Sequence, residues 1–298
     1  MDNRSEVREF LTSRRAKITP QQAGLPAHTG NRRVKGLRRE EVALLAGVSA
    51  EYYARLERGN LSGVSEPVID SLARALQLDD AERAHLDDLA RTANTSRRPA
   101  RRRAPQPIRA SLQHLLDAMT EAPAFIRNGR LDVLAVNRLG RALYQPMFND
   151  PARPANLARF RFLDPGAADF YPEGEESANS TVALLRTEAG RDPYDRDLTD
   201  LVGELSTRSE EFRARWAAHN VRLHQTGVKR VHHPAVGDLS LSFEAMPLPT
   251  DPGLTLTVYT AEPGTASHDG LKLLASWAAT LDQAEQPEAG LPTGDHAA

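Results

Sequence analysis

The hydrophobic positions at the start of the chain recur at the spacing of an amphipathic helix. Val7, Phe10 and Leu11 fall on one face of a helix predicted over residues 5–15. The following stretch, 16–37, is basic and is interrupted by prolines and glycines, so we predict irregular structure there. The chain is thus predicted to begin with one helix and a long connection.

Residues 36–59 carry the most informative hydrophobic pattern of the chain. They predict two short helices joined by a tight turn. Val42 and Leu45 form the apolar stripe of the first helix, and Tyr53 and Leu56 form that of the second. Both helices therefore have one buried face and one face left for solvent or a partner.

The turn between these helices has its own local signals. Gly47 stands where a helix needs a left-handed residue to end. Ser49 offers a side-chain oxygen to cap the next helix. Together with the basic residues around it, this layout is typical of a DNA-binding helix-turn-helix, whose second helix enters the major groove. A plain helical hairpin is the alternative interpretation.

Two further helical patterns complete an N-terminal bundle. One follows Ser65, which is predicted to cap it, with Pro67 in the first turn, where proline is tolerated. The other begins at Asp79 and continues through Ala90. We therefore expect an all-α domain of five helices over residues 1–92.

A linker is predicted over residues 93–107, because arginines alternate there with prolines and cannot form a core. It is interpreted either as a solvated tether or as an arm that touches DNA phosphates. A second unstructured segment, the tail over 284–298, is predicted to be disordered.

Residues 108–283 show mixed periodicity. Helical patterns are predicted over 108–119, after 137, and over 176–189, 195–206, 209–219 and 267–279. Strand patterns are predicted over 124–127, 131–136, 221–232, 238–246 and 254–260, with a hairpin turn at Asn128-Gly129. This order is typical of a PAS-like α+β domain, an antiparallel sheet with helices on one face that can enclose an apolar pocket. The fold class is therefore multidomain, an all-α helix-turn-helix bundle followed by an α+β PAS-like domain.

Composition and charge divide the 298-residue chain in the same way. Residues 1–103 carry 20 Lys and Arg against 14 Asp and Glu, whereas the rest carries 18 against 26. Only the front part is thus expected to meet a polyanion. The chain has no cysteine, and neither a signal sequence nor a membrane span is visible, so we expect a cytoplasmic protein with no membrane partner.

The outward face of the second helix, predicted over 50–58, supplies the candidate DNA contacts. Arg55 could bind guanine through two hydrogen bonds, and Glu51 could accept from a cytosine amino group. The basic side chains near the helix starts and ends could contact phosphates. The predicted DNA-binding residues are Arg38, Arg39, Ser49, Ala50, Glu51, Tyr52, Ala54, Arg55 and Arg58.

Two motifs in this region resemble a known family. They are Gly-Leu-Arg-Arg-Glu-Glu-Val-Ala at 36–43 and Ala-Gly-Val-Ser…Tyr-Tyr…Leu-Glu-Arg-Gly at 46–59. Through them, residues 5–92 resemble the lambda-repressor-like (XRE family) helix-turn-helix domain. The resemblance implies sequence-specific binding to double-stranded DNA.

Residues 108–274 resemble the MmyB-like ligand-binding domain. The matching stretches are 131–137, 201–206, 212–216, 233–239 and 258–264. The resemblance implies a PAS-like sensor domain with a fatty-acid-like ligand. The chain departs from the usual family pattern at Val136, at 171–174 and at 219–221.

Four residues are candidates for binding the ligand. They are Asn137, Arg186, His219 and His233. Arg186 could pair with a ligand carboxylate, with a surface arginine as the alternative. The two histidines could be polar groups of a pocket or hydrogen-bonded structural residues. No metal site is predicted, because His232 and His233 are adjacent and point to opposite faces of a strand, and no cofactor is predicted.

These observations predict a transcriptional regulator that binds an operator and responds to a small apolar or fatty-acid-like ligand. It is expected to act as a homodimer, with ligand control through dimer geometry or stability because the linker is flexible. The alternative is a regulator whose C-terminal domain only dimerises or binds a protein partner. An enzyme is the third interpretation. It ranks behind the other two because the sequence has no phosphate loop, Gly-x-Gly-x-x-Gly motif or nucleophile elbow.

Overall fold

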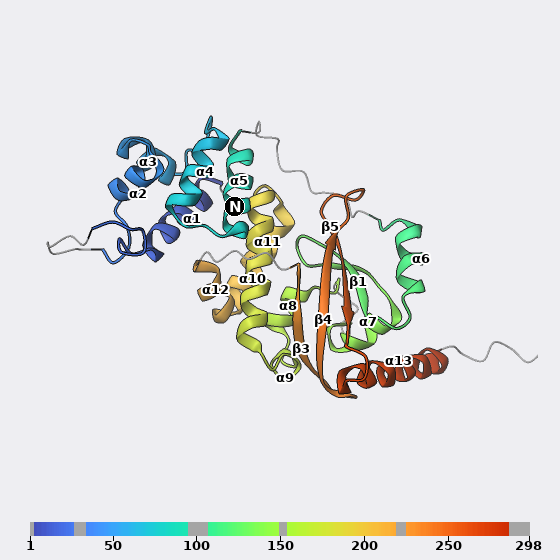
Figure 1. Ribbon diagram of the computed structural model, residues 1–298. Coiled ribbons are helices and arrows are strands. Elements are labelled where there is room, and N and C mark those ends of the chain that lie inside the picture. The colour runs from blue at the N-terminus through green and yellow to red at the C-terminus, as the bar shows by residue number, and fades with distance from the viewer. Residues whose placement is uncertain (1–2, 27–33, 95–106, 149–153, 219–224, 286–298) are drawn as a thin grey trace, which may run out of the picture.

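The computed structural model describes residues 3–26, 34–94, 107–148, 154–218 and 225–285, which are drawn in colour in Figure 1. His219, most of the predicted linker and almost all of the predicted tail lie outside these residues.

The described residues up to 94 form a bundle of five helices. They are α1 (Asn3–Lys17), α2 (Arg39–Ala46), α3 (Ala50–Glu57), α4 (Glu66–Ala75) and α5 (Asp80–Asn94). The residues predicted to face inward on the first three helices form the centre of the core: Val7, Phe10, Leu11, Val42, Tyr53 and Leu56 are fully buried. Leu45 is half-buried and packs at the edge of this core.

The turn between α2 and α3 follows its local signals. Gly47 ends α2 with a φ of 67°, in the left-handed region that glycine adopts easily. The Ser49 hydroxyl caps α3 by accepting a hydrogen bond from the Tyr52 amide at 3.1 Å. Ser65 occupies the N-cap position of α4, as predicted, but its side chain makes no capping hydrogen bond there.

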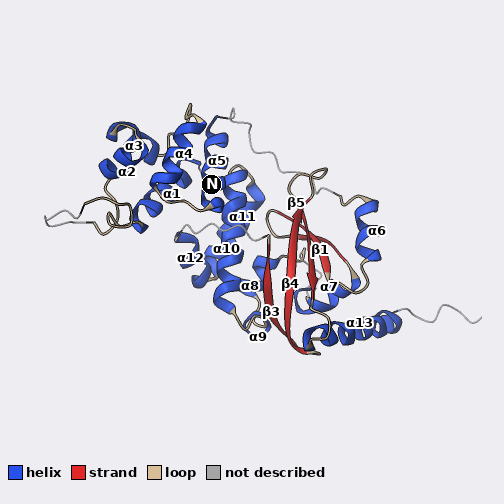
Figure 2. Cartoon of the chain, viewed as in Figure 1, coloured by secondary structure: helices blue, strands red, loops and turns tan. Residues whose placement is uncertain are grey.

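The C-terminal domain contains a five-stranded antiparallel sheet. Its strands are β1 (Ala124–Asn128), β2 (Val133–Val136), β3 (Thr226–His233), β4 (Gly237–Pro247) and β5 (Leu254–Thr260). They lie in the order β2-β1-β5-β4-β3, so the first hairpin forms one edge and β3 the other. Figure 2 shows this sheet apart from the all-helical N-terminal bundle.

Helices cover parts of both faces of this sheet. The helical elements are α6 (Ala110–Ala118), α7 (Arg138–Leu143), the 3-10 turn η1 (Gln145–Phe148), α8 (Leu157–Leu163), α9 (Ala167–Phe170), α10 (Gly174–Arg191), α11 (Arg196–Arg208), α12 (Glu210–Ala217) and α13 (Ala266–Glu285). On β1, Phe125 packs into the core that contains α7 and α13, whereas its neighbour Ile126 packs against α6. The expectation of helices on one face only was therefore wrong, because α6 buries the second apolar face.

The two short helices α8 and α9 were not predicted. Seven and four residues are too few for a helical period to stand out from a loop. The Asn156 side chain starts α8 by accepting hydrogen bonds from the amides of Ala158 and Arg159, both at 2.9 Å.

The hairpin between β1 and β2 is present, but its turn differs from the predicted two-residue type. Leu131, not Gly129, takes the left-handed conformation, with a φ of 67°. This conformation costs a residue with a side chain about 1–2 kcal/mol. The cost is offset because the Leu131 side chain is buried in the core formed with α10 and α11.

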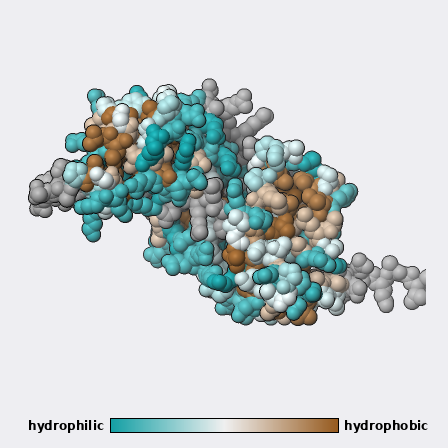
Figure 3. Space-filling model, in the orientation of Figure 1, coloured by the Kyte–Doolittle hydropathy of each residue, from teal (hydrophilic) through white to brown (hydrophobic). Residues whose placement is uncertain are grey.

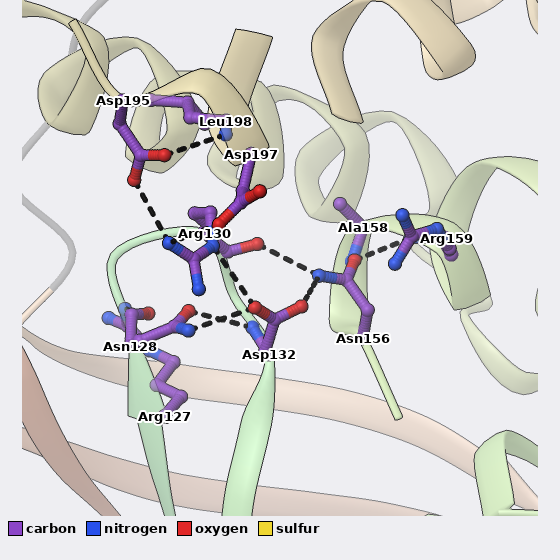
Figure 4. A network of polar contacts seen from close by, with 10 residues as sticks. All are labelled: Arg127, Asn128, Arg130, Asp132, Asn156, Ala158, Arg159, Asp195, Asp197 and Leu198. Carbon is purple, nitrogen blue, oxygen red and sulfur yellow. Dashed lines mark hydrogen bonds and ion pairs between the residues drawn. The ribbon is translucent and has the colours of Figure 1, made fainter. Parts of the chain in front are cut away.

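A polar network holds this turn in place (Figure 4). Arg130 bonds to Asp132 at 3.2 Å and to Asp195, the N-cap of α11, at 3.0 Å. The Asn156 amide donates to the Arg130 carbonyl at 2.9 Å and to the Asp132 carboxylate at 2.8 Å. The turn is therefore tied to the starts of both α8 and α11.

Candidate functional site

The solvent-facing side of α3 forms the first candidate site. The nine predicted DNA-binding residues are all exposed or half-exposed, whereas Tyr53 and Leu56 on the same helix are buried. The predicted division between inward and outward residues is therefore present. One exposed pair is already ordered, since the Arg55 guanidinium lies over the Tyr52 ring, 4.8 Å from its centroid.

The Glu57 carboxylate joins this surface to the rest of the bundle. It is buried and accepts a hydrogen bond from Arg15 at 2.6 Å and a second one from Arg39. Arg39 keeps 58% of its side chain exposed, so its charge remains available at the surface. Arg38 precedes α2, and its backbone amide donates a hydrogen bond to the Glu41 carboxylate at 2.6 Å. The residue is exposed to solvent.

A cavity in the C-terminal domain forms the second candidate site. Its aromatic walls come from the sheet and the neighbouring helices: Phe125, Tyr144, Tyr171, Phe243 and Tyr259. One side is formed by α10, through Ser180, Thr181 and Leu184. The volume open to the centres of water-sized molecules is about 50 Å³, enough for a few waters and far less than a drug-sized ligand needs.

Three tyrosines contribute neutral polar groups to the cavity wall. The hydroxyls of Tyr144 and Tyr259 share a hydrogen bond of 2.8 Å. Burial raises the pKa of Tyr259 to about 12, and it raises the pKa values of Tyr144 and Tyr171 further. These hydroxyls therefore stay neutral and can donate to a ligand or accept from one.

Two cationic side chains also line the cavity. Burial lowers the pKa of Lys229 to about 8 and that of Arg127 to about 10. The neighbouring charges of Arg161 and Arg127 lower the pKa of Lys229 further, and the charge of Arg191 does the same for Arg127. Glu176 and Glu188 partly compensate, but neither cation has an ion-pair partner within 4 Å among the described residues.

Ser180 adds an unused polar group to the same wall. Its hydroxyl is buried and has no hydrogen-bond partner in the described part of the chain. On the same cavity wall, the Lys229 ammonium group lies 5.2 Å from the Tyr171 ring centroid. The cavity thus combines apolar walls with a few unsatisfied polar groups, a composition typical of small-molecule sites.

The predicted ligand-binding residues do not line this cavity. The Asn137 side chain caps α7 and has four backbone partners, accepting from Ala124 and Gly140 and donating to Met119 and Ala122. It is a structural residue because all its hydrogen-bonding capacity is used.

His233 is structural for a similar reason. Its Nε2 lies 3.1 Å from the Ala142 carbonyl, and its Nδ1 accepts from the Ala235 amide at 3.2 Å. This pairing is that of a neutral imidazole, and burial lowers the pKa of the ring. The third histidine candidate, His219, lies outside the described residues.

Arg186 is neither in the cavity nor on the surface. It is fully buried and bonds to Glu6 of the N-terminal bundle at 2.5 Å. Its guanidinium also donates to the Trp216 carbonyl and stacks over the Trp216 ring, 4.0 Å from the centroid. Both sequence interpretations of this residue were therefore wrong, because neither considered contact between the domains.

The cationic residues that do line the cavity were missed by the sequence reasoning. Their signal was the strand alternation itself, because Lys229 has the same parity as the buried residues Val231 and His233 on β3. Arg127 likewise shares its face with Phe125 on β1. A charged residue at an inward position of a strand costs free energy, so it indicates a functional site.

The arrangement defines a class of protein: a DNA-binding transcription regulator with a separate ligand-binding domain. A helix-turn-helix domain model matches residues 9–86, and the model of the MmyB-like transcription regulator ligand-binding domain matches residues 108–274. The chain belongs to the MmyB-like transcription regulators, since this match covers more than half of its length. A search of curated proteins gave no match.

Two other properties bear on the functional class. Among the helices of residues 3–285 that the structure describes, none is long and apolar enough to cross a membrane. The same residues contain no cluster of three or more histidines and carboxylates arranged to hold a metal ion.

Proposed function

We propose that the chain binds a specific double-stranded DNA sequence by placing α3 in the major groove. The exposed residues of α3 fit this role, since Arg55 and Glu51 can hydrogen-bond to base edges. Arg38, Arg39 and Arg58 surround the helix and fit phosphates. The buried core of the bundle holds this surface rigid.

The ligand of the PAS-like domain is, in this proposal, an amphiphile with an anionic head, such as a fatty acid. One observation carries it: Arg127 and Lys229 line an apolar cavity without an ion-pair partner among the described residues. A ligand carboxylate would lower the combined charge of the two cations from +2 to +1 and accept a hydrogen bond from Ser180. The aromatic walls would contact the acyl chain.

A long acyl chain requires the cavity to widen. The present space of about 50 Å³ lies below the roughly 300 Å³ at which small-molecule pockets begin. Binding would therefore move at least one wall. If the walls cannot move, the domain is the alternative module, which fills the pocket with its own side chains.

Binding of dodecanoate, measured by calorimetry, tests the proposed ligand class. Arg127→Met and Lys229→Met should each weaken dodecanoate by about 10-fold or more, because each removes a charge-assisted contact. Lys272→Met is the matched control, since Lys272 is exposed on α13. Dodecanol tests the charge, and equal binding of the alcohol and the acid, or no binding of either, would reject an anionic ligand.

We also propose that the chain acts as a homodimer, because one short recognition helix contacts few bases. The C-terminal domain offers a surface for it. Figure 3 shows hydrophobic residues gathered on the surface of this domain. Its exposed large apolar side chains include Leu115 of α6, Leu134 of β2 and Met246 of β4. Sedimentation of the full chain with and without DNA tests this, and a monomer on DNA would contradict it.

A further inference from the structure

Helix α10 lies between the sheet and the N-terminal bundle (Figure 1). Its residues Ser180, Thr181 and Leu184 line the cavity, and the helix also packs against α5. Leu184 and Arg186 are two residues apart, about 200° around the helix axis. One turn of α10 therefore faces the ligand site on one side and the DNA-binding domain on the other.

The contact between α10 and the bundle is buried and charged. Arg186 and Glu6 are 0% and 6% exposed in their side chains. His85 of α5 lies in the same contact, with its Nε2 3.6 Å from the Glu6 carboxylate. A buried ion pair tolerates little separation, because either charge alone in the interior is strongly unfavourable.

Close packing adds a second constraint at the end of the helix. A Cβ atom at Gly190 would lie 2.4 Å from the His85 ring, so only glycine allows this approach without a shift. The Thr92 hydroxyl reaches the Gly190 carbonyl at 3.4 Å. The contact therefore fixes the position of α10 against α5 over more than one turn.

We propose that α10 transmits occupancy of the cavity to the DNA-binding domain through the Glu6–Arg186 ion pair and the Gly190–His85 contact. This inference rests on the proposed function of the cavity as a ligand site. Widening the cavity displaces its walls, and α10 is a wall that also contacts the bundle. A ligand that moves α10 therefore strains or breaks its contact with the bundle, because closely packed interfaces switch between discrete arrangements and do not deform gradually.

This route differs from the one expected from the sequence, where a flexible linker argued against a rigid connection between the domains. The linker does not need to be rigid, because the domains touch directly through α1, α5 and α10. Dimer geometry can still respond to the ligand, but control then begins inside each subunit.

The first test needs no ligand, because coupling between two sites is reciprocal. A DNA duplex is selected from a random pool with the full-length chain, and amide hydrogen exchange is measured with and without it. DNA should change the exchange rates of the α10 amides facing the cavity, 180–184, by at least about twofold. No change in the wild type would overturn the proposal.

The second test uses substitutions that disrupt the contact between α10 and the bundle in the full-length chain. Glu6→Leu/Arg186→Met removes both buried charges, a replacement that cores often tolerate. Gly190→Ala widens the contact without touching the charges, which keeps the test valid if the double variant fails to fold. In each variant the DNA-induced change at 180–184 should disappear. Glu210→Gln/Arg213→Gln, an exposed pair on α12, is the control and should behave as the wild type.

The third test uses dodecanoate as the probe. In the wild type it should change the dissociation constant for the selected duplex by a factor of about 5–150, a usual range for coupled sites. In Glu6→Leu/Arg186→Met and in Gly190→Ala, dodecanoate should still bind. It should then leave the dissociation constant for the duplex nearly unchanged, a factor close to 1. An undiminished factor would overturn the proposal. If dodecanoate does not bind the wild type, the proposed ligand class fails, and the exchange experiment with DNA decides the coupling separately.

Discussion

The two candidate sites place their cationic residues in opposite environments. On α3 and around it, arginines are exposed to solvent, and Arg39 keeps more than half of its side chain accessible. In the C-terminal cavity, Arg127 is buried and Lys229 has its pKa lowered to about 8. The exposed cations can meet a polyanion without reorganisation, whereas the buried ones are unfavourable until an anion joins them.

This difference determines how each site can discriminate between ligands. An exposed cation attracts any phosphate, so selectivity on DNA must come from hydrogen bonds to base edges. A buried cation rejects a neutral ligand of the same shape, because the charge then stays unpaired. The four predictions below test this contrast, from the largest expected effect to the smallest.

Glu57→Ala should give the largest change in stability. It leaves Arg15 and Arg39 without the carboxylate they share, and we expect a loss of about 3 kcal/mol in the free energy of unfolding of the bundle. Hydrogen exchange at the amides of α2 and α3 measures it. The exposed Glu51→Ala is the control, with a change below about 0.5 kcal/mol. Equal losses in both variants would show that the buried position of Glu57 is unimportant.

Arg55→Ala should cost about 1–3 kcal/mol in binding to the selected duplex and should relax the preference at one base pair. The loss is expected because Arg55 lies on the outward face of α3, positioned over Tyr52. Competition binding with single-base variants of the duplex measures it. An equal loss on random DNA would mean that Arg55 contacts only the backbone, as we propose for Arg58.

The N-terminal bundle could be predicted closely because its signals are local. Helical spacing identified the buried face of α3, and Gly47 and Ser49 identified the turn from single residues. The outward face then follows from the inward one, since a helix has only two sides to assign. The exposed face of α3 could therefore be predicted residue by residue, and its contact with DNA stays a prediction.

The C-terminal site could be predicted only in part, because it depends on contacts between distant segments. Strand alternation predicted most of the sheet, yet Arg186 was predicted to pair with a ligand carboxylate or to lie on the surface. Its partner Glu6 lies 180 residues away in the chain, in another domain. Likewise, Gly129 does lie in the predicted turn, but a Cβ there would collide with the Glu188 carboxyl of α10, a contact that the sequence did not predict. Patterns of neighbouring residues cannot predict such contacts, because the partners lie far apart in the chain.

The affinity for dodecanoate should fall as the pH rises above about 8. Burial lowers the pKa of Lys229 to about 8, so above that value the free protein has lost the ammonium proton. Binding then requires its return, and affinity should fall by up to about 10-fold per pH unit, while the ligand carboxylate stays ionised. Calorimetry from pH 7 to 9.5 measures this dependence. It should be absent in Lys229→Met and present in the exposed control Lys272→Met.

Ser49→Ala should give the smallest change, a loss of about 1 kcal/mol in the stability of α3. The Ser49 hydroxyl accepts from the Tyr52 amide, and no alanine atom can replace it. Ser65→Ala is the matched variant, because Ser65 precedes α4 in the same extended backbone conformation but makes no side-chain capping bond. Its loss should be only a few tenths of a kcal/mol, measured as before by hydrogen exchange. Equal losses would mean that the Ser49 capping bond adds nothing to the stability of α3.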